Sequence, residues 1–171
     1  APFDELSAAA ARLRAASDIP GARLRGLHLE GRYLNPVRRG VHPPELLTAP
    51  SVTELEQIAG VCGRPFHITY APELDRDGAF LSRAISLGAT VAAGHTDMTC
   101  EQAKEAESRG VTAYSHLYNA MPPLHHRAGG AVCAALTGGA FCELICDGMH
   151  VSPEMVKLAY ICVGCGRLVL V

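Results

Sequence analysis

Three ionisable residues, Glu30, His95 and His116, each stand at the end of a short apolar run, just before a turn that contains Gly or Asn. Such runs are typical of buried strands, and the carboxyl ends of parallel strands meet at one mouth of a barrel. Two neutral imidazoles and one carboxylate can hold a divalent cation and leave one coordination position open for water. The pattern therefore predicts a hydrolytic centre with one divalent metal ion. We expect zinc, with iron(II), cobalt and manganese as alternatives.

Other candidate groups carry less information. His28 lies two residues before Glu30 on the same strand face and is interpreted as a hydrogen-bonded barrel histidine, whereas His67 carries no further signal. Arg127 lies just before a Gly-Gly pair, where flexible backbone could approach an anion that a guanidinium grips. A plain surface arginine is the interpretation that the residues alone favour for Arg127.

The seven cysteines are an odd number scattered through apolar runs, which favours reduced thiols and a cytoplasmic protein over a disulfide framework. Cys162 and Cys165 form the single CxxC motif. A zinc ribbon needs a second such pair, and a redox motif should open a helix rather than follow one. We therefore do not interpret this motif as a metal or redox site.

The composition is that of a globular protein. The chain has 171 residues, of which 49% are hydrophobic and 19% charged, enough for one domain with a proper core. The formal net charge is −2 and no cluster of Lys and Arg is present, so we expect no nucleic-acid partner. No stretch approaches the roughly 20 apolar residues of a membrane span, and no signal segment opens the chain. We therefore expect no membrane partner.

Strand-like runs alternate with helical patterns, which predicts βαβ units and a parallel sheet. Expected strands are 24–30, 66–71, 89–94, 111–117, 141–146 and 166–171; expected helices lie near 4–16, 54–62 and 76–87, after Thr99, near 131–138 and after Ser152. Six strands rather than eight predict an α/β fold of the (β/α)8 TIM-barrel type found in metal-dependent hydrolases, present as a fragment over residues 1–171. The first two strands would be missing and the eighth cut at its tip.

Three helix starts carry capping signals. Thr53 with Glu56 predicts a capping box, and so does Thr99 with Gln102. Ser152 followed by a proline and a glutamate predicts an N-cap with proline at the first helical position.

Several segments resemble the N-acetylglucosamine-6-phosphate deacetylases of the amidohydrolase superfamily. They occur in the family's order and cover nearly all of the chain: 26–31, 34–35 with 40–43, 71–73, 93–96, 116–121 and 147–151. The Gly-Leu-His-Leu-Glu-Gly block and the block 116–121 are the most specific. The resemblance implies a partial catalytic barrel, with N-terminal strands, a small β-sandwich domain and a C-terminal part lying outside this sequence.

The resemblance implies roles for individual residues. Glu30, His95 and His116 match the metal ligands, and His42 matches a histidine that polarises the acetamide carbonyl. The residues that match substrate-contacting positions are Val41, His42, Asn119, Ala120, Arg127, Asp147 and His150. The family's catalytic aspartate follows a strand that looks like 168–171, and the sequence stops just before it. We therefore expect the chain alone to bind metal weakly and to show no meaningful turnover.

The implied reaction is hydrolysis of N-acetylglucosamine-6-phosphate to glucosamine-6-phosphate and acetate, in amino-sugar metabolism, by a protein that is a homodimer when complete. Two departures from the family, Arg32 in place of proline and Ala128-Gly129 without a preceding proline, predict looser loops at the barrel mouth. Deacetylation of N-acetylgalactosamine-6-phosphate and non-catalytic sugar-phosphate binding stay open as alternatives. A two-metal cyclic-amide hydrolase is disfavoured, because neither Lys104 nor Lys157 ends a strand to supply a bridging lysine.

Overall fold

The computed structural model describes residues 1–16, 20–21, 23–63 and 66–171. In these residues six strands form one sheet in the order β1-β2-β3-β4-β5-β6, and every neighbouring pair is parallel. The strands are β1 (Leu27–Glu30), β2 (Phe66–Tyr70), β3 (Thr90–Ala93), β4 (Ala113–Tyr114), β5 (Phe141–Leu144) and β6 (Leu168–Leu170). The expected α/β class and parallel order are confirmed.

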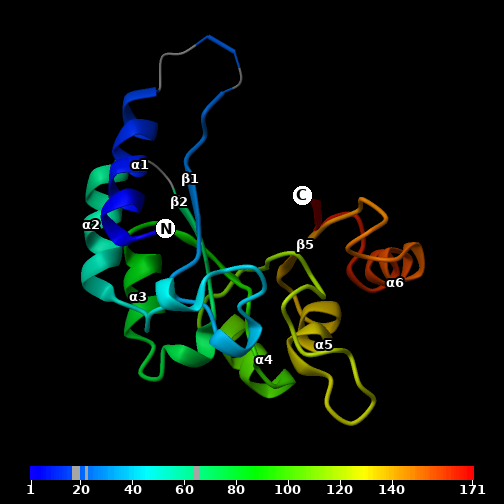
Figure 1. Cartoon of the computed structure of the whole chain (residues 1–171). Helices are drawn as coiled ribbons and strands as arrows, with labels where there is room; N and C mark the ends of the chain where they lie inside the picture. Colours follow the sequence, from blue (N-terminus) through cyan, green and yellow to red (C-terminus); the bar gives the residue numbers. More distant parts are fainter. Residues whose placement is uncertain (17–19, 22, 64–65) are drawn as a thin grey trace.

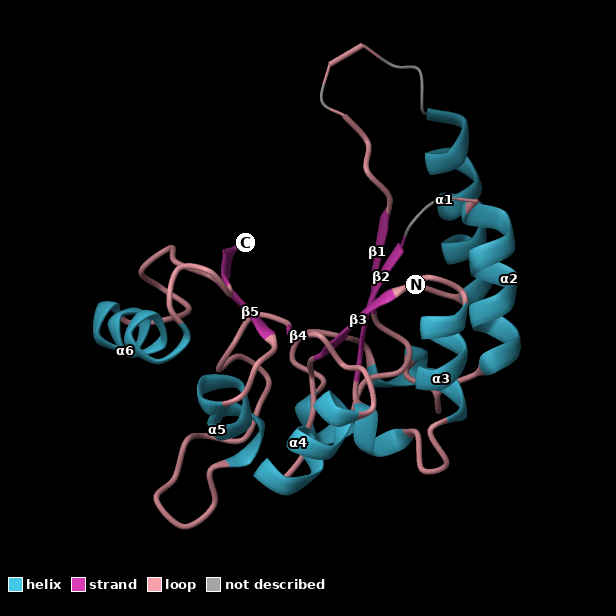
Figure 2. Cartoon of the chain, turned by 180° about the vertical axis from the view of Figure 1, so that it is seen from behind, coloured by secondary structure: helices cyan, strands magenta, loops and turns pink. Residues whose placement is uncertain are grey.

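The sheet curls into a half-barrel, with helices along its outer side (Figure 1). The α-helices are α1 (Phe3–Ala15), α2 (Val52–Cys62), α3 (Ala79–Ser86), α4 (Cys100–Ser108), α5 (Gly130–Thr137) and α6 (Pro153–Val163), and the short 3-10 helices are η2 (Pro36–Arg38), η3 (Pro44–Leu46) and η4 (Pro72–Leu74). Figure 2 shows α1, α2 and α3 on one flank and α5 and α6 on the other, with α4 between them. None of the helices that the structure describes combines the length and apolar composition that a membrane crossing requires.

The hydrophobic core lies between the outer face of the sheet and the helices. Its strand residues include the buried Ile68, Tyr70, Val91, Tyr114 and Leu144, and its helix residues include Leu55, Ile58, Phe80, Ala103 and Ala134. Alternate strand positions point to the opposite, inner face, because side chains along a strand alternate. That inner face carries the polar residues His28, Glu30, Thr69, Ser115 and Glu143. The fold thus separates an apolar packing face from a polar inner face.

Two of the three predicted helix starts are confirmed. The Thr99–Gln102 capping box is present in full, and Ser152 accepts a hydrogen bond from the backbone of Met155 at 3.5 Å, with Pro153 opening the helix. The box predicted at Thr53 is wrong. The N-cap of α2 is Ser51, whose extended backbone lets its hydroxyl accept the backbone N–H of Glu54, whereas Thr53 already lies inside the helix.

The strands are shorter than the apolar runs that predicted them. The clearest case is the run 111–117, of which only Ala113–Tyr114 is regular strand. The backbone of His116 turns into the left-handed region at φ 34°, which ends the extended conformation. Because β4 ends at Tyr114, the side chain of His116 reaches across the mouth of the half-barrel to Glu30 of β1.

Candidate metal centre

Three strand ends bring their side chains to one point. Glu30 is the last residue of β1, His95 follows β3 after one glycine, and His116 follows β4 after one serine. The Oε1 atom of Glu30 lies 2.8 Å from Nε2 of His116 and 3.4 Å from Nε2 of His95, and the two Nε2 atoms are 3.1 Å apart. The structure therefore brings together the three residues that the sequence singled out as metal ligands.

Unusual backbone angles aim the two imidazoles inward. The described non-glycine residues with positive φ are Arg32, His95, His116, Tyr118 and Ala120, and all of them lie in the segments that follow β1, β3 and β4. Such angles cost of the order of 1 kcal/mol each and persist where the surrounding structure over-determines them, often at functional sites. Their concentration at this mouth supports a functional role for it.

The outer nitrogen of each imidazole is fixed by a carbonyl. Nδ1 of His95 donates to the carbonyl of Arg38 at 2.9 Å, and Nδ1 of His116 donates to the carbonyl of Asn119 at 3.2 Å. Because a carbonyl oxygen can only accept, the Nδ1 atoms carry the protons in the neutral rings. When both rings are neutral, two Nε2 lone pairs and a carboxylate face one another at contact distance, and a positive charge between them, from a proton or a metal ion, offsets the repulsion. The donor set fits a divalent metal ion.

The ionisation of the cluster follows the same geometry. The hydrogen bond from His116, then that from His95, holds the pKa of Glu30 far below its ordinary value, although burial opposes this. Burial disfavours the charged form of His116, but the hydrogen bond and the charge of Glu30 outweigh burial and raise the pKa of His116. Without a metal ion, a proton shared by this pair supplies the positive charge.

His42 adds a further donor beside the three. Its ring centroid lies 4.9 Å from that of His95, with the two rings perpendicular, and Glu30, His42 and His95 each offer one ligand atom within 4.8 Å of the others. Burial, followed by the nearby His95, lowers the pKa of His42 and favours a neutral ring. The shorter distances of the set with His116 make that set the tighter candidate, and His42 lies at its edge.

The candidate substrate residues do not all lie in one place. Val41 is 94% exposed next to His42. Asn119 donates from Nδ2 to the carbonyls of His116 and Leu117, and the carbonyl of Ala120 accepts from the backbone of Thr96. Asn119 and Ala120 are therefore tied to the segments that carry His116 and His95, whereas Val41 is only adjacent to His42 in the chain.

The other three candidates form separate groups among the described residues. Asp147 accepts the backbone N–H groups of Met149 and His150, and its Oδ2 lies 2.7 Å from Nδ1 of His150 in an exposed turn after β5. Arg127 lines a cavity with Asp97, Thr99 and the Gly129-Gly130 pair, between the starts of α4 and α5. Neither group makes a hydrogen bond or ion pair with Glu30, His95 or His116 in the described chain.

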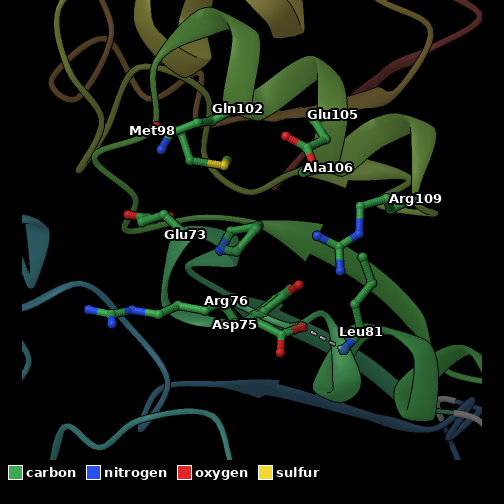
Figure 3. A pocket seen from close by; sticks show the side chains of 11 residues that line it. Glu73, Asp75, Arg76, Leu81, Met98, Gln102, Glu105, Ala106 and Arg109 are labelled. Atoms are coloured by element: carbon green, nitrogen blue, oxygen red, sulfur yellow. Dashed lines mark hydrogen bonds between the residues drawn. The ribbon is translucent and has the colours of Figure 1, made fainter.

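Another cavity lies elsewhere, on the outer side of the sheet. It has a volume of about 230 Å³ between η4 and α4, and its lining includes Glu73, Asp75, Arg76, Glu105 and Arg109 (Figure 3). The outward-facing Tyr70 and the helix residue Ala106 also line it, which places it across the sheet from the inner-face cluster. The chemistry therefore points to the strand ends and not to this cavity.

Sequence reasoning gave no role to several residues that support the site. Glu73 lies in the segment 71–73 that resembles the deacetylases, but sequence reasoning assigned it no role of its own. Its carboxylate accepts three hydrogen bonds from residues in the segments around His95. His67 bonds Thr90 and lies 3.4 Å from Glu143, a carboxylate that alternation along strand 141–146 could have placed on the inner face. His28 accepts or donates a 2.8 Å hydrogen bond with Thr69, as its interpretation predicted.

The expectation that Arg32 loosens its loop is wrong. Its Nε and NH2 atoms donate to both carboxylate oxygens of Glu54, at 3.1 and 2.9 Å, and its side chain is only 11% exposed. The hydroxyl of Tyr33 also donates to Glu54, at 2.8 Å. Since such two-point charged contacts have a fixed geometry, Arg32 ties the start of the loop to α2.

Comparison with known proteins gives consistent matches, although no family model matches the chain. N-acetylglucosamine-6-phosphate deacetylase of Bacillus subtilis is 38% identical over 160 residues, which cover 91% of this chain and 40% of that protein. N-acetylgalactosamine-6-phosphate deacetylase of Escherichia coli O157:H7 is 35% identical over 175 residues, covering 100% of this chain and 46% of that protein. The chain thus spans less than half the length of the curated relatives it matches.

Solved structures agree with the sequence matches. N-acetyl-D-glucosamine-6-phosphate deacetylase of Mycobacterium smegmatis superposes with a TM-score of 0.92 at 31% identity, over 100% of this chain and 45% of that one. A mutant of the same protein was solved in complex with N-acetyl-D-glucosamine-6-phosphate and gives a TM-score of 0.93. The enzyme of Thermotoga maritima gives 0.90 at 32% identity. The half-barrel is therefore the fold of a continuous part of these barrels.

Proposed function

We propose that this chain is part of an N-acetylglucosamine-6-phosphate deacetylase, an amidohydrolase that converts its substrate to glucosamine-6-phosphate and acetate. The observation that carries the proposal is the meeting of Glu30, His95 and His116 at the strand ends, with both Nε2 atoms directed at the carboxylate. The matched relatives and structural neighbours are deacetylases of acetylated amino-sugar phosphates, so this donor set lies in a chain related to such enzymes.

Glu30, His95 and His116 would hold one divalent ion, for which we propose zinc because histidine nitrogen and carboxylate oxygen suit it. When bound, such an ion polarises a carbonyl and lowers the pKa of a bound water. His42, neutral beside His95, would donate a hydrogen bond to the acetamide oxygen and stabilise its developing negative charge, an effect of about 3 kcal/mol for one good donor. Proton transfer falls to the family's aspartate, which follows a strand that resembles β6.

The sugar phosphate would be held away from the reacting carbon. We propose that Arg127 and His150 contact it together with Asp147, Val41 and the segment of Asn119 and Ala120. Binding energy from such remote contacts can orient the amide for attack. We further propose, from the resemblance, that the whole protein is a homodimer and contains domains besides this barrel segment. Seven cysteines, all free in the structure, support a reducing and therefore cytoplasmic setting.

Metal binding by the chain itself tests the proposed centre. We expect the chelator-treated chain of 171 residues to take up one equivalent of Zn²⁺ or Co²⁺ in a calorimetric titration. His116→Ala should weaken that affinity at least about 100-fold, beyond the 10- to 100-fold typical of outer-shell partners. His126→Ala, in the exposed loop before α5, is the matched control and should bind as the wild type does. Equal binding by both variants would contradict the assignment.

The alternative substrate has direct support, because the N-acetylgalactosamine-6-phosphate deacetylase match covers the whole chain. The two sugars differ in the configuration of one hydroxyl. A competition assay with the full-length protein and both sugar phosphates shows which of the two substrates the protein prefers. A preference for the glucosamine epimer supports the proposal, a preference for the galactosamine epimer selects the alternative, and binding of either without acetate release indicates a non-catalytic relative.

A further inference from the structure

We propose that Glu73 is a positioning residue that sets the orientation of His95 toward the metal ion, through the two segments that hold this imidazole. The inference rests on the proposed metal centre. Glu73 makes no hydrogen bond to Glu30, His95 or His116 in the described chain, so it would act through other groups.

The carboxylate of Glu73 gathers three donors from two distant loops. Its Oε1 accepts from Nδ2 of Asn35 at 2.9 Å and from the backbone N–H of Asp97 at 2.6 Å, and its Oε2 accepts from the hydroxyl of Thr96 at 2.6 Å. Hydrogen bonds to a charged acceptor are shorter and roughly twice as strong as neutral ones. Glu73 thereby joins the loop after β1 to the turn after β3.

Both segments that Glu73 joins hold His95. Thr96 and Asp97 follow His95 directly in the chain, so their position fixes the backbone from which the ring projects. On the other side, the backbone N–H of Asn35 donates to the carbonyl of His95 at 3.0 Å. The side-chain oxygen of Asn35 also accepts from Val37 and caps η2, whose last residue, Arg38, supplies the carbonyl that receives Nδ1–H of His95.

A glutamine cannot replace this carboxylate without loss. Three donors converge on Glu73, whereas a glutamine offers one oxygen and turns an NH₂ group toward the remaining donor. An ionised carboxylate can only accept, so the hydroxyl of Thr96 donates to Glu73 while it accepts from the backbone N–H of Met98 at 3.2 Å. In Figure 3, Glu73 lies at the opposite side of the outer cavity from Arg109, and the neighbouring Asp75 points elsewhere, to the start of α3.

Asp75 provides the matched control. Its two oxygens accept the backbone N–H groups of Phe80 and Leu81, so Asp75→Asn should weaken the start of α3 without touching His95. We expect Glu73→Gln to weaken Co²⁺ or Zn²⁺ affinity about 10- to 100-fold, and Asp75→Asn to lower stability while leaving the affinity unchanged. Equal affinity of Glu73→Gln and wild type, measured by calorimetry on folded protein, overturns the proposal.

A second readout does not depend on metal. The ¹⁵N shifts of the His95 ring, recorded without metal at a pH where the ring is neutral, report which nitrogen carries the proton. Wild type should show the Nδ1–H tautomer, and Glu73→Gln a mixture of tautomers. An unchanged tautomer contradicts the inference. If wild type binds no metal, the proposed function fails, while this measurement still decides the role of Glu73.

A milder pair of variants covers the case in which Glu73→Gln does not fold. Thr96→Val removes one of the three donors and should shift metal affinity and tautomer in the same direction by a smaller amount. Thr96→Ser keeps the hydroxyl and should restore both. Identical behaviour of the valine and serine variants would reject the proposal.

Discussion

At the scale of residues, the decisive feature is the direction in which nitrogen lone pairs point. The Nδ1 atoms of His95 and His116 donate hydrogen bonds to the carbonyls of Arg38 and Asn119. Both Nε2 atoms are therefore directed at Glu30. The sequence could predict which three residues meet, because their places at strand ends carry that information. It could not predict Glu73, whose role depends on donors 38, 23 and 24 positions away along the chain.

The coupling between Glu30 and His116 predicts a pH dependence of stability in the metal-free chain. The lowered pKa of Glu30 contributes stability that is present above its unfolded value of about 4.5 and is lost as the pH falls through the folded value. The raised pKa of His116 contributes stability that is present below its unfolded value and is lost as the pH rises through the folded value. Both contributions therefore coexist in the mildly acidic range.

We expect Glu30→Gln to lower the pKa of His116 and to cost most stability near pH 5.5, with a smaller cost near pH 9, because the stability that the raised pKa contributes is lost as the pH rises through the folded value. NMR titration of His116 and urea denaturation at about these two pH values provide the measurements. Glu56→Gln, which breaks an exposed contact with Arg83, is the control and should leave the pKa of His116 in place. A pH-independent cost of Glu30→Gln would contradict the coupling.

At the scale of elements, the alternation of strands and helices was predictable, because each strand carries buried apolar residues on one face and each helix has an apolar face. The exact ends were less predictable. The run 111–117 was expected to be strand throughout, yet only Ala113–Tyr114 is regular strand and the backbone of His116 turns into the left-handed region. At α2, Ser51 and Thr53 both have capping side chains, and the extended backbone of Ser51 decides between them.

Ser51 and Thr53 form a matched pair for a stability test. Ser51→Ala removes the acceptor for the backbone N–H of Glu54 and should lower the free energy of unfolding by about 1 kcal/mol. Thr53→Ala, at an exposed position inside the helix, should be neutral or slightly stabilising, because alanine is the better helix former. Chemical denaturation measures both, and a larger cost at Thr53 would restore the capping box predicted from the sequence.

At the scale of the whole molecule, the curled sheet has two edges, β1 and β6, each paired on one side only within the described chain. The β6 edge also exposes apolar side chains, since Val169, Leu170 and Val171 are 41%, 68% and 63% exposed. Unpaired strand edges with apolar side chains favour association with other chains. The parallel class of the sheet was predictable from the sequence, whereas the exposure along β6 required coordinates.

We expect the chain of 171 residues to self-associate through this edge, and Leu170→Lys to reduce the association. Ile161→Lys on α6 is the matched control, because Ile161 has nearly the same exposed fraction, 67%, but does not lie on a sheet edge. Sedimentation velocity over a range of concentrations compares the three proteins. Equal association of all three would show that the β6 edge is not the contact.

The backbone conformation of Arg32 differs from the one that a proline at this position would adopt. Arg32 adopts φ 63°, whereas a proline ring holds φ near −65°, so the two residues require turns of opposite hand. Arg32→Pro in this chain would require a different backbone conformation in the turn. It would also remove the guanidinium group that pairs with Glu54. Residues 32 and 54 are thus expected to be substituted together among related sequences. A protein with only one of the two substitutions should be less stable than a protein with both or neither.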